Sequence, residues 1–222
     1  MGDNNQPSKI RKGAIILAGG DSKRLGQPKA LLDFNGQPLI EVMVKRLSTF
    51  FQEITIVTDR SDLYGGLPVR LISDELNVQQ KSPLRGIHAG LNASDLPYQF
   101  VVACDMPMLN LDLINYMARF APDYDAVVPR IGNYFQPLHS YYRRNCINVI
   151  EKQVLTGLYK VTDFYANLKV RFISEQDISR FDPEQKSFIN INTWSDYEQA
   201  LSIYLKENNK FNNGGDRHAE NT

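Results

Sequence analysis

GAIILAGGDSKRLGQPKA, residues 13–30, places an apolar run before a pair of glycines, several basic residues and a lysine that follows a proline. The apolar run predicts a strand that is buried on both faces. Glycine permits backbone conformations and close approaches that a Cβ atom would obstruct. Because Lys23, Arg24 and Lys29 surround these glycines with positive charge, the stretch predicts a loop that binds a small anion, most commonly a phosphate chain.

Outward from this stretch, the chain alternates between apolar runs and amphipathic segments. Further strands are predicted at 54–58, 69–72, 100–104, 125–129 and 170–173. Helices are predicted at 38–50, 84–93, 111–120, 145–155 and 194–205, and a further extended segment at 135–142. This alternation, with unbroken apolar strands, predicts an α/β fold whose mostly parallel central sheet is covered by helices on both faces.

The length of 222 residues suits one domain with a full core, which we place at 13–205. Residues 1–12 are mostly polar and are expected to be flexible. Residues 206–222 have almost nothing to bury, so a disordered tail is expected there.

Charge and composition exclude several classes of protein. The 25 basic and 25 acidic residues cancel, which disfavours binding to nucleic acid. No apolar run approaches the roughly 20 residues that span a bilayer, and the N-terminus lacks the apolar core of a secretory signal, so no membrane attachment is expected. Cys104 and Cys146 lie far apart and outside any CxxC motif, which argues against a disulfide framework or a zinc site and favours a reducing cytoplasm.

Spacing distinguishes the glycine loop from two common phosphate loops. A Walker A loop requires GxxxxGK[ST], whereas five residues separate Gly20 from Gly26, and Gln27 and Pro28 follow. The dinucleotide fingerprint GxGxxG does not fit either, because Gly19 and Gly20 are adjacent. The glycines alone are also compatible with a tight turn, and it is the basic residues behind them that favour an anion site.

Asp105 follows directly after the predicted strand 100–104. In open α/β sheets, ligands bind beyond the carboxyl ends of the strands, so Asp105 and the glycine loop are expected at the same edge. A lone carboxylate there suits Mg²⁺, which binds few protein groups and keeps several waters. The alternative is that Asp105 caps the helix that follows it.

Five motifs occur in an order that resembles a known family. They are LAGGDSKRLGQPKALL (17–32), ISDELNVQQKSPLRGIHAGL (72–91), VVACDMPML (101–109), FQPLHSYYRR (135–144) and FININT (188–193). The first resembles the LAGGxSxRMGxxKALL pattern of nucleotidyltransferases with a Rossmann-like fold. Together they resemble the molybdenum cofactor guanylyltransferases, the MobA family, across residues 13–205. Leu25 stands where the family usually has methionine, and Ser82 where it commonly has glycine.

The resemblance implies a three-layer Rossmann-like nucleotidyltransferase fold and an Mg²⁺-dependent reaction. The terminal phosphate of molybdopterin would attack the α-phosphate of GTP, which transfers GMP and releases pyrophosphate. A phosphate nucleophile is already ionised at neutral pH and needs no general base, so positioning, a metal ion and basic side chains would supply the catalysis. GTP and molybdopterin are the expected partners, and proteins that mature molybdoenzymes are further candidates.

The resemblance also implies roles for individual residues. The catalytic residues would be Lys29, Asp105 and Arg24, with Asp105 as the metal ligand. The nucleotide would be bound by Leu17, Ala18, Gly19, Lys29, Asp74, Gly86 and Asp105. Asn190 and Asn192 would lie near the metal and the acceptor phosphate, and because they alternate across Ile191 they should point to one face of an extended segment.

Alternatives stay open at this point. Asp74 could instead be a turn residue, and Lys29 a solvated surface residue. The enzyme could be a cytidylyltransferase or a sugar-phosphate nucleotidyltransferase of the same superfamily, although cytidylyl enzymes typically have LAAG rather than LAGG. The chain could also be a non-catalytic accessory protein that binds nucleotide or cofactor, but such a binder has little need of Lys29, Asp105 and two asparagines.

Overall fold

The structure is a computed structural model that describes residues 12–19, 25–74, 76, 80 and 82–214. The segment 1–12, which we expect to be flexible, lies outside these residues except for Lys12. Lys12 is ordered as the first residue of the first strand, one position earlier than predicted.

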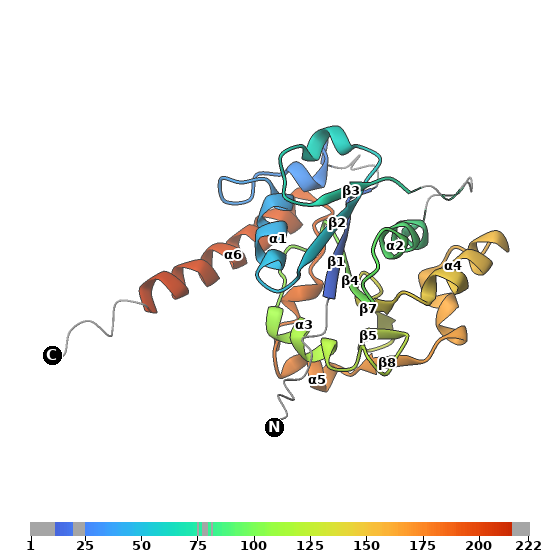
Figure 1. The fold of residues 1–222 in the computed structure, drawn as a ribbon. Helices are drawn as coiled ribbons and strands as arrows, with labels where there is room; N and C mark the ends of the chain where they lie inside the picture. Colours follow the sequence, from blue (N-terminus) through green and yellow to red (C-terminus); the bar gives the residue numbers. More distant parts are fainter. Residues whose placement is uncertain (1–11, 20–24, 75, 77–79, 81, 215–222) are drawn as a thin grey trace, which may run out of the picture.

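A mixed sheet of eight strands forms the centre of the described chain (Figure 1). The strands are β1 Lys12–Leu17, β2 Glu53–Val57, β3 Arg70–Ile72, β4 Tyr98–Ala103, β5 Ala126–Ile131, β6 Tyr134–Phe135, β7 His139–Arg143 and β8 Val170–Ile173. Their order is β3-β2-β1-β4-β7-β5-β6, and β8 also pairs with β5. All six strands predicted from apolar runs are present, and the extended segment 135–142 supplies parts of β6 and β7.

Strand direction changes in the middle of the sheet. β3, β2, β1 and β4 run parallel, as do β5 and β8, whereas β7 lies antiparallel between β4 and β5. The chain leaves β5 through a tight turn at Gly132, whose φ is 54°, and returns as β6 and then β7. So short a connection can join only antiparallel neighbours, which explains why the mostly parallel sheet is mixed.

Six α-helices and four short 3₁₀ segments surround the sheet in the described chain. The α-helices are α1 Leu39–Ser48, α2 Pro83–Asn92, α3 Leu111–Ala118, α4 Cys146–Leu155, α5 Glu175–Ser179 and α6 Trp194–Gly214. The 3₁₀ segments are η1 Lys29–Leu31, η2 Ser61–Tyr64, η3 Val161–Asn167 and η4 Lys186–Phe188. All the predicted helices are present. α5 and the 3₁₀ segments were not predicted, because three to seven residues are too few to show a helical period.

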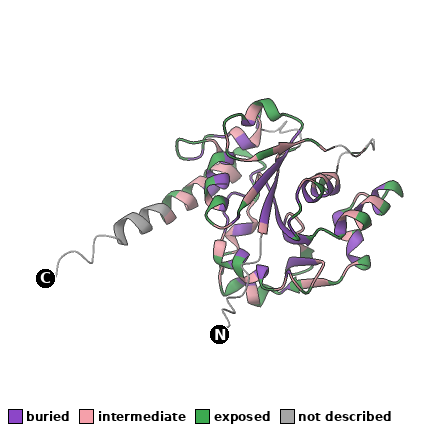
Figure 2. Cartoon of the chain, viewed as in Figure 1, coloured by how far each residue is buried: buried purple, intermediate pink, exposed green. Residues whose placement is uncertain are grey.

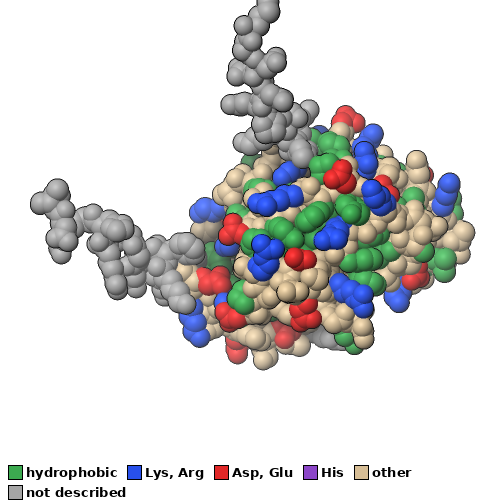
Figure 3. Space-filling model, turned by 90° about the horizontal axis from the view of Figure 1, so that it is seen from below, with side chains coloured by type: hydrophobic (Ala, Val, Ile, Leu, Met, Phe, Trp, Pro, Cys, Tyr) green, Lys and Arg blue, Asp and Glu red, His purple; other side chains and the backbone are tan. Residues whose placement is uncertain are grey.

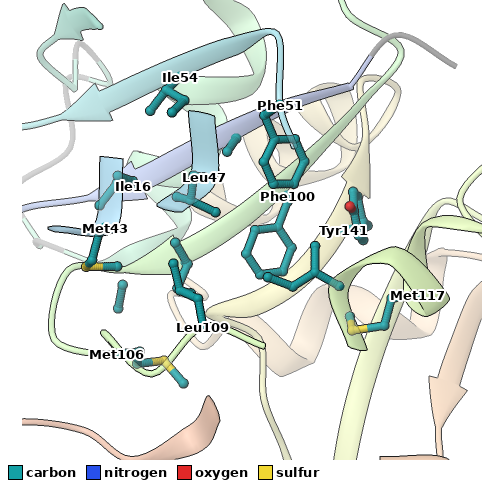
Figure 4. Packing of buried hydrophobic residues seen from close by; sticks show 14 of the residues in the cluster. Ile16, Met43, Leu47, Phe51, Ile54, Phe100, Met106, Leu109, Met117 and Tyr141 are labelled. Carbon is teal, nitrogen blue, oxygen red and sulfur yellow. The ribbon is translucent and has the colours of Figure 1, made fainter. Parts of the chain in front are cut away.

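Alternating side chains of the strands pack into two cores, one on each face of the sheet, which gives the fold three layers. Figure 2 shows the largely buried strands of the sheet between helices that are partly exposed. Ala14 and Ile16 of β1 pack with α1, α3 and α5 on one face of the sheet. Ile15 packs with α2 and α4 on the other face. Figure 4 shows the first core, in which the rings of Phe51 and Phe100 stack with centroids 5.8 Å apart. The predicted three-layer α/β fold is confirmed.

Helix α2 approaches β1 closely enough to exclude a side chain. A Cβ atom on Gly90 would lie 2.6 Å from Cδ1 and 2.7 Å from Cγ2 of Ile15, which is fully buried. One turn earlier, a Cβ atom on Gly86 would lie 3.0 Å from Cδ2 of Leu17. Glycine at Gly90 therefore lets the helix lie directly against the strand.

Helix α6 is longer than predicted. We expected a helix to residue 205 and a disordered tail after it, but α6 continues to Gly214 and projects from the sheet (Figure 1). Residues 206–213 contain neither glycine nor proline, so nothing in them stops a helix. The Nζ atom of Lys186 lies 3.2 Å from Oε1 of Glu207 and ties the start of this extension to the domain. Residues 215–222 lie outside the described chain.

The surface carries charges of both signs. Figure 3 shows the face seen from below, where Lys and Arg side chains lie among hydrophobic and acidic ones. This mixture agrees with the balanced composition of the chain. Within the described ranges, every helix is too short or too polar to cross a bilayer.

Candidate active site

A cleft of about 510 Å³ opens at the carboxyl ends of β1, β2 and β4. It is lined by Leu17, Ala18, Gly19, Pro28, Lys29, Ala30, Val57, Thr58, Asp59, Tyr64, Asp74, Ser82, Pro83, Gly86, Ala103, Cys104, Asp105, Leu138, Asn190 and Asn192. Two backbone hydrogen bonds hold the strand ends together here: Ala18 N donates to Val57 O at 2.9 Å, and Cys104 N donates to Leu17 O at 3.0 Å. The end of the first strand and Asp105 thus meet in one cleft, as we expected because ligands bind beyond the carboxyl ends of parallel strands.

Three polar side chains from distant parts of the sequence meet in this cleft. The Nζ atom of Lys29 donates to Oδ2 of Asp105 at 2.8 Å and to Oδ1 of Asn192 at 2.7 Å. The side chains of Lys29 and Asp105 are 18% and 20% exposed, so their ion pair is partly shielded from water yet open to the cleft. We call Lys29, Asp105 and Asn192 the Lys29 cluster.

Local structure places the first two members of this cluster. Pro28 precedes η1, and Leu31 N donates to Pro28 O at 3.0 Å, which closes a tight turn. Ala30 is 1% exposed and anchors that turn in the core, while its neighbour Lys29 reaches into the cleft. Asp105 lies just beyond β4, and its carbonyl oxygen accepts from Ile191 N at 2.9 Å. That bond joins the end of β4 to the segment that carries Asn192.

The residues before and after Asn192 in the sequence fix its position. Ile191 is fully buried beside it, in a core that includes Ala200 of α6. Asn192 N and Thr193 N donate to Oδ2 of Asp196 at 2.9 and 2.8 Å, and these bonds lower the pKa of the Asp196 carboxyl. The first turn of α6 therefore fixes the backbone of Asn192.

Asn190 lines the same cleft as Asn192, and the residue between them in the sequence, Ile191, is buried. The Nδ2 atom of Asn190 donates to the carbonyl oxygen of Phe188 at 3.2 Å. The two asparagines are thus on one side of their segment, which is the placement that their alternation predicts.

Asp74 lines the cleft beyond β3 and forms an ion pair with α2. The Nε atom of Arg85 donates to Oδ1 of Asp74 at 2.8 Å, and the two side chains are 14% and 18% exposed. Asp74 is therefore tied to α2, one residue from Gly86, which also lines the cleft. A Cβ atom on Gly19 would meet nothing within 4 Å, so no packing within the described chain crowds this position.

The structure does not place every residue that we singled out. Arg24 lies outside the described residues, as do Gly20 and Lys23. The alternative that Asp105 caps the next helix is wrong, because the side chain of Asn110 accepts from Leu113 N at 2.9 Å and caps α3.

Several residues that line the cleft were not singled out from the sequence. Thr58 and Asp59 follow β2, and the rule that placed Asp105 at a strand end would also have found them. Leu138 also lines the cleft, directly before the reversed strand β7, and the segment 136–138 was expected from the resemblance to lie on the molybdopterin side. Cys104 lies in the cleft wall as well, and burial raises the pKa of its thiol to about 12, so it is protonated at neutral pH.

The fold and the cleft define a class of protein. A layered α/β sheet with a cleft at the carboxyl ends of its parallel strands, holding a lysine and a carboxylate, is typical of Rossmann-like proteins that bind phosphorylated ligands. Comparison with known sequences identifies the family. The chain belongs to the family of the MobA-like NTP transferase domain, whose family model matches residues 14–172. The predicted family and the predicted nucleotidyltransferase class are confirmed.

Individual relatives agree with this assignment. The chain is 35% identical over 206 residues to a probable molybdenum cofactor guanylyltransferase of Peptoclostridium acidaminophilum, covering 90% of this chain and 92% of the relative. It is 34% identical over 188 residues to the molybdenum cofactor guanylyltransferase of Syntrophotalea carbinolica, covering 84% and 89%. The crystal structure of molybdopterin-guanine dinucleotide biosynthesis protein A from Archaeoglobus fulgidus is similar, with a TM-score of 0.76 and 26% identity over 87% of this chain and 99% of that one.

Proposed function

We propose that this chain transfers GMP from GTP to the terminal phosphate of molybdopterin, or of its molybdenum-bound form, the molybdenum cofactor, and releases pyrophosphate. The names of the two guanylyltransferase relatives support the substrates. The observation that carries the proposal is the Lys29 cluster, which brings a cation, a carboxylate and a carboxamide together at the carboxyl edge of the sheet.

The main obstacle to this reaction is electrostatic. The attacking phosphate oxygen is already ionised at neutral pH, but it must approach a second polyanion, and negative charge grows on the leaving pyrophosphate. The Lys29 ammonium, in a partly shielded cleft, would attract both phosphate chains and stabilise the leaving group. Holding the two substrates in line supplies the rest of the rate enhancement.

The residues of the cleft fit a divalent metal ion. Mg²⁺ is bound in such sites by one or two carboxylates together with substrate phosphates, and Asp105 provides the carboxylate. The structure already shows a cation, the Lys29 ammonium, held by Asp105 and Asn192. Within the described part of the chain, no three histidine, cysteine or acidic side chains gather around one point, which suits an ion that is held largely by its substrates. When bound, the ion would neutralise phosphate charge at Asp105.

The nucleotide would extend from the Lys29 cluster toward the end of β3. Its phosphates would lie over the backbone of Leu17, Ala18 and Gly19, where the open space beside Gly19 leaves room for them. Asp74 and Gly86 would face the nucleoside, and guanine has N1–H and N2–H₂ donors that a carboxylate or a carbonyl oxygen can accept. Asn190 would face the acceptor phosphate.

A panel of nucleotides tests the proposal directly. Purified protein would be incubated with Mg²⁺, molybdopterin and each NTP separately, and pyrophosphate release would be followed. GTP should be the preferred substrate. Release with CTP but not GTP would overturn the choice of base, and no release with any nucleotide would favour a binding protein without turnover.

An Asp105→Asn variant tests the carboxylate. Loss of the charge that the phosphates and the ion require should lower turnover by about 100-fold or more, with little change in the circular dichroism spectrum. Asp163→Asn, at an exposed position of η3, is a matched control and should keep full activity. Unchanged turnover in Asp105→Asn would rule out its proposed role.

A further inference from the structure

The ammonium group of Lys29 lies between two side-chain oxygen atoms of the cleft. Its Nζ atom lies within hydrogen-bond distance of Oδ2 of Asp105 and of Oδ1 of Asn192 at the same time. Carboxylate and carboxamide oxygens are the hard ligands that Mg²⁺ and Mn²⁺ prefer. The same two oxygen atoms are therefore suited to either kind of cation.

We propose that Asp105 and Asn192 form one cation seat, that Lys29 fills it in the protein without substrates, and that a divalent ion competes with Lys29 for it. The inference rests on the proposed function and deepens it in two ways. It assigns Asn192 as a second protein ligand beside Asp105. It also makes the release of Lys29 toward the phosphates depend on the ion.

Distance and charge make the two occupants exclusive. The ammonium lies 2.8 and 2.7 Å from the two oxygens, whereas Mg²⁺ binds oxygen at about 2.0–2.1 Å. An ion bound to both oxygens would lie against Nζ, and two cations in a cleft that is only partly open to water repel each other strongly. Lys29 must therefore leave when the ion binds.

The neighbouring structure allows this exchange. Lys29 has a flexible four-carbon stem and three donors, so its ammonium can turn from the seat to phosphate oxygens. The side chain of Asn192 is exposed and can draw in to the shorter metal distance, while its backbone stays fixed by Asp196. Lys29 would thus be delivered to the phosphates only when the ion that neutralises them is in place.

Binding of Mn²⁺ alone tests the exchange without nucleotide or acceptor. The full chain, Lys29→Met and the control Lys152→Met would be titrated with Mn²⁺ and followed by electron paramagnetic resonance. Lys152 is exposed on α4, so its replacement removes the same charge far from the seat. We expect Lys29→Met to bind Mn²⁺ at least about tenfold more tightly than the unmodified chain, because a competing cation has been removed, and Lys152→Met to be unchanged. Equal or weaker binding by Lys29→Met would overturn the proposal.

A second variant tests the role of Asn192. In the Lys29→Met background, Asn192→Ala should lose about tenfold in Mn²⁺ affinity, since it removes a ligand; no loss would show that Asn192 is not part of the seat. In the full chain labelled with ¹³C at the ε carbon of its lysines, the Lys29 resonance should shift on addition of Mg²⁺ alone, and a fixed resonance would contradict its release. These readouts do not depend on turnover, so a failed guanylyl transfer assay would leave them interpretable.

Discussion

Two glycines of α2 offer a matched test of how the helix packs on β1. Gly90→Ala would place a methyl group 2.6–2.9 Å from three atoms of Ile15, closer than real Cβ contacts come. Ile15 is fully buried and β-branched, so it has little freedom to move. Overpacking of this kind costs about 1–3 kcal/mol, and the better helix propensity of alanine returns about 1 kcal/mol. We expect a net loss of up to about 2 kcal/mol in the free energy of unfolding.

Gly86→Ala, one turn earlier, makes the same chemical change in the same helix. Its methyl group would meet mainly one terminal atom of Leu17 at 3.0 Å, and Leu17 is only half-buried and can shift. We expect this variant to be as stable as the unmodified chain or up to about 1 kcal/mol more stable.

Urea unfolding followed by circular dichroism measures both variants, and Gly90→Ala should also melt up to about 8 °C lower. If the two variants unfold at the same urea concentration, the close approach of α2 to β1 does not limit stability and the argument is wrong.

Three further predictions concern a buried histidine, the two cysteines and the carboxylate at the start of α6. Burial lowers the pKa of His139 to about 3, so this side chain stays neutral in the folded protein, whereas in the unfolded chain it takes up a proton below about pH 6.5. The free energy of unfolding should therefore fall by about 1.4 kcal/mol for each pH unit below about 6.5. Urea titrations near pH 7 and pH 5 should show a smaller loss of stability for His139→Phe than for the unmodified chain. Burial raises the pKa values of Cys104 and Cys146 to about 12, so at neutral pH a thiol reagent should label both more slowly in the native protein than after denaturation, and the buried Cys146 more slowly than Cys104, which lines the cleft; rapid native labelling of Cys146 would contradict this. Asp196→Ala removes the acceptor at the start of α6, so it should lower both the urea concentration at which the protein unfolds and the turnover that depends on Asn192, whereas Ser195→Ala, at an exposed position, should change neither.

Local patterns predicted the elements of this fold better than their arrangement. Unbroken apolar runs such as 100–104 marked the strands, because a strand buried on both faces leaves that signature. The direction of β7 was not predictable in the same way, since pairing between β4 and β5 is decided by contacts that are distant in the sequence. The extension of α6 beyond residue 205 was missed because low hydrophobicity was taken as a reason for disorder, while the lack of a stop signal was overlooked.

The candidate site shows the same division. Asp105 could be placed at the sheet edge from its position after a strand. The contact between Lys29 and Asn192 spans 163 positions of sequence, so only the resemblance to a family suggested that they act together. No local pattern predicts the hydrogen bond from Ile191 N to the carbonyl oxygen of Asp105, which brings Asn192 close to Lys29.

That backbone bond has a consequence for the way the protein is made. During translation, Lys29 and Asp105 emerge before β7, which pairs with β4, and before Asn192, which accepts the hydrogen bond from Lys29. A nascent or prematurely ended chain that stops before Ile191 therefore has Lys29 and Asp105 but lacks the segment that carries Asn192. Such fragments should not turn over GTP.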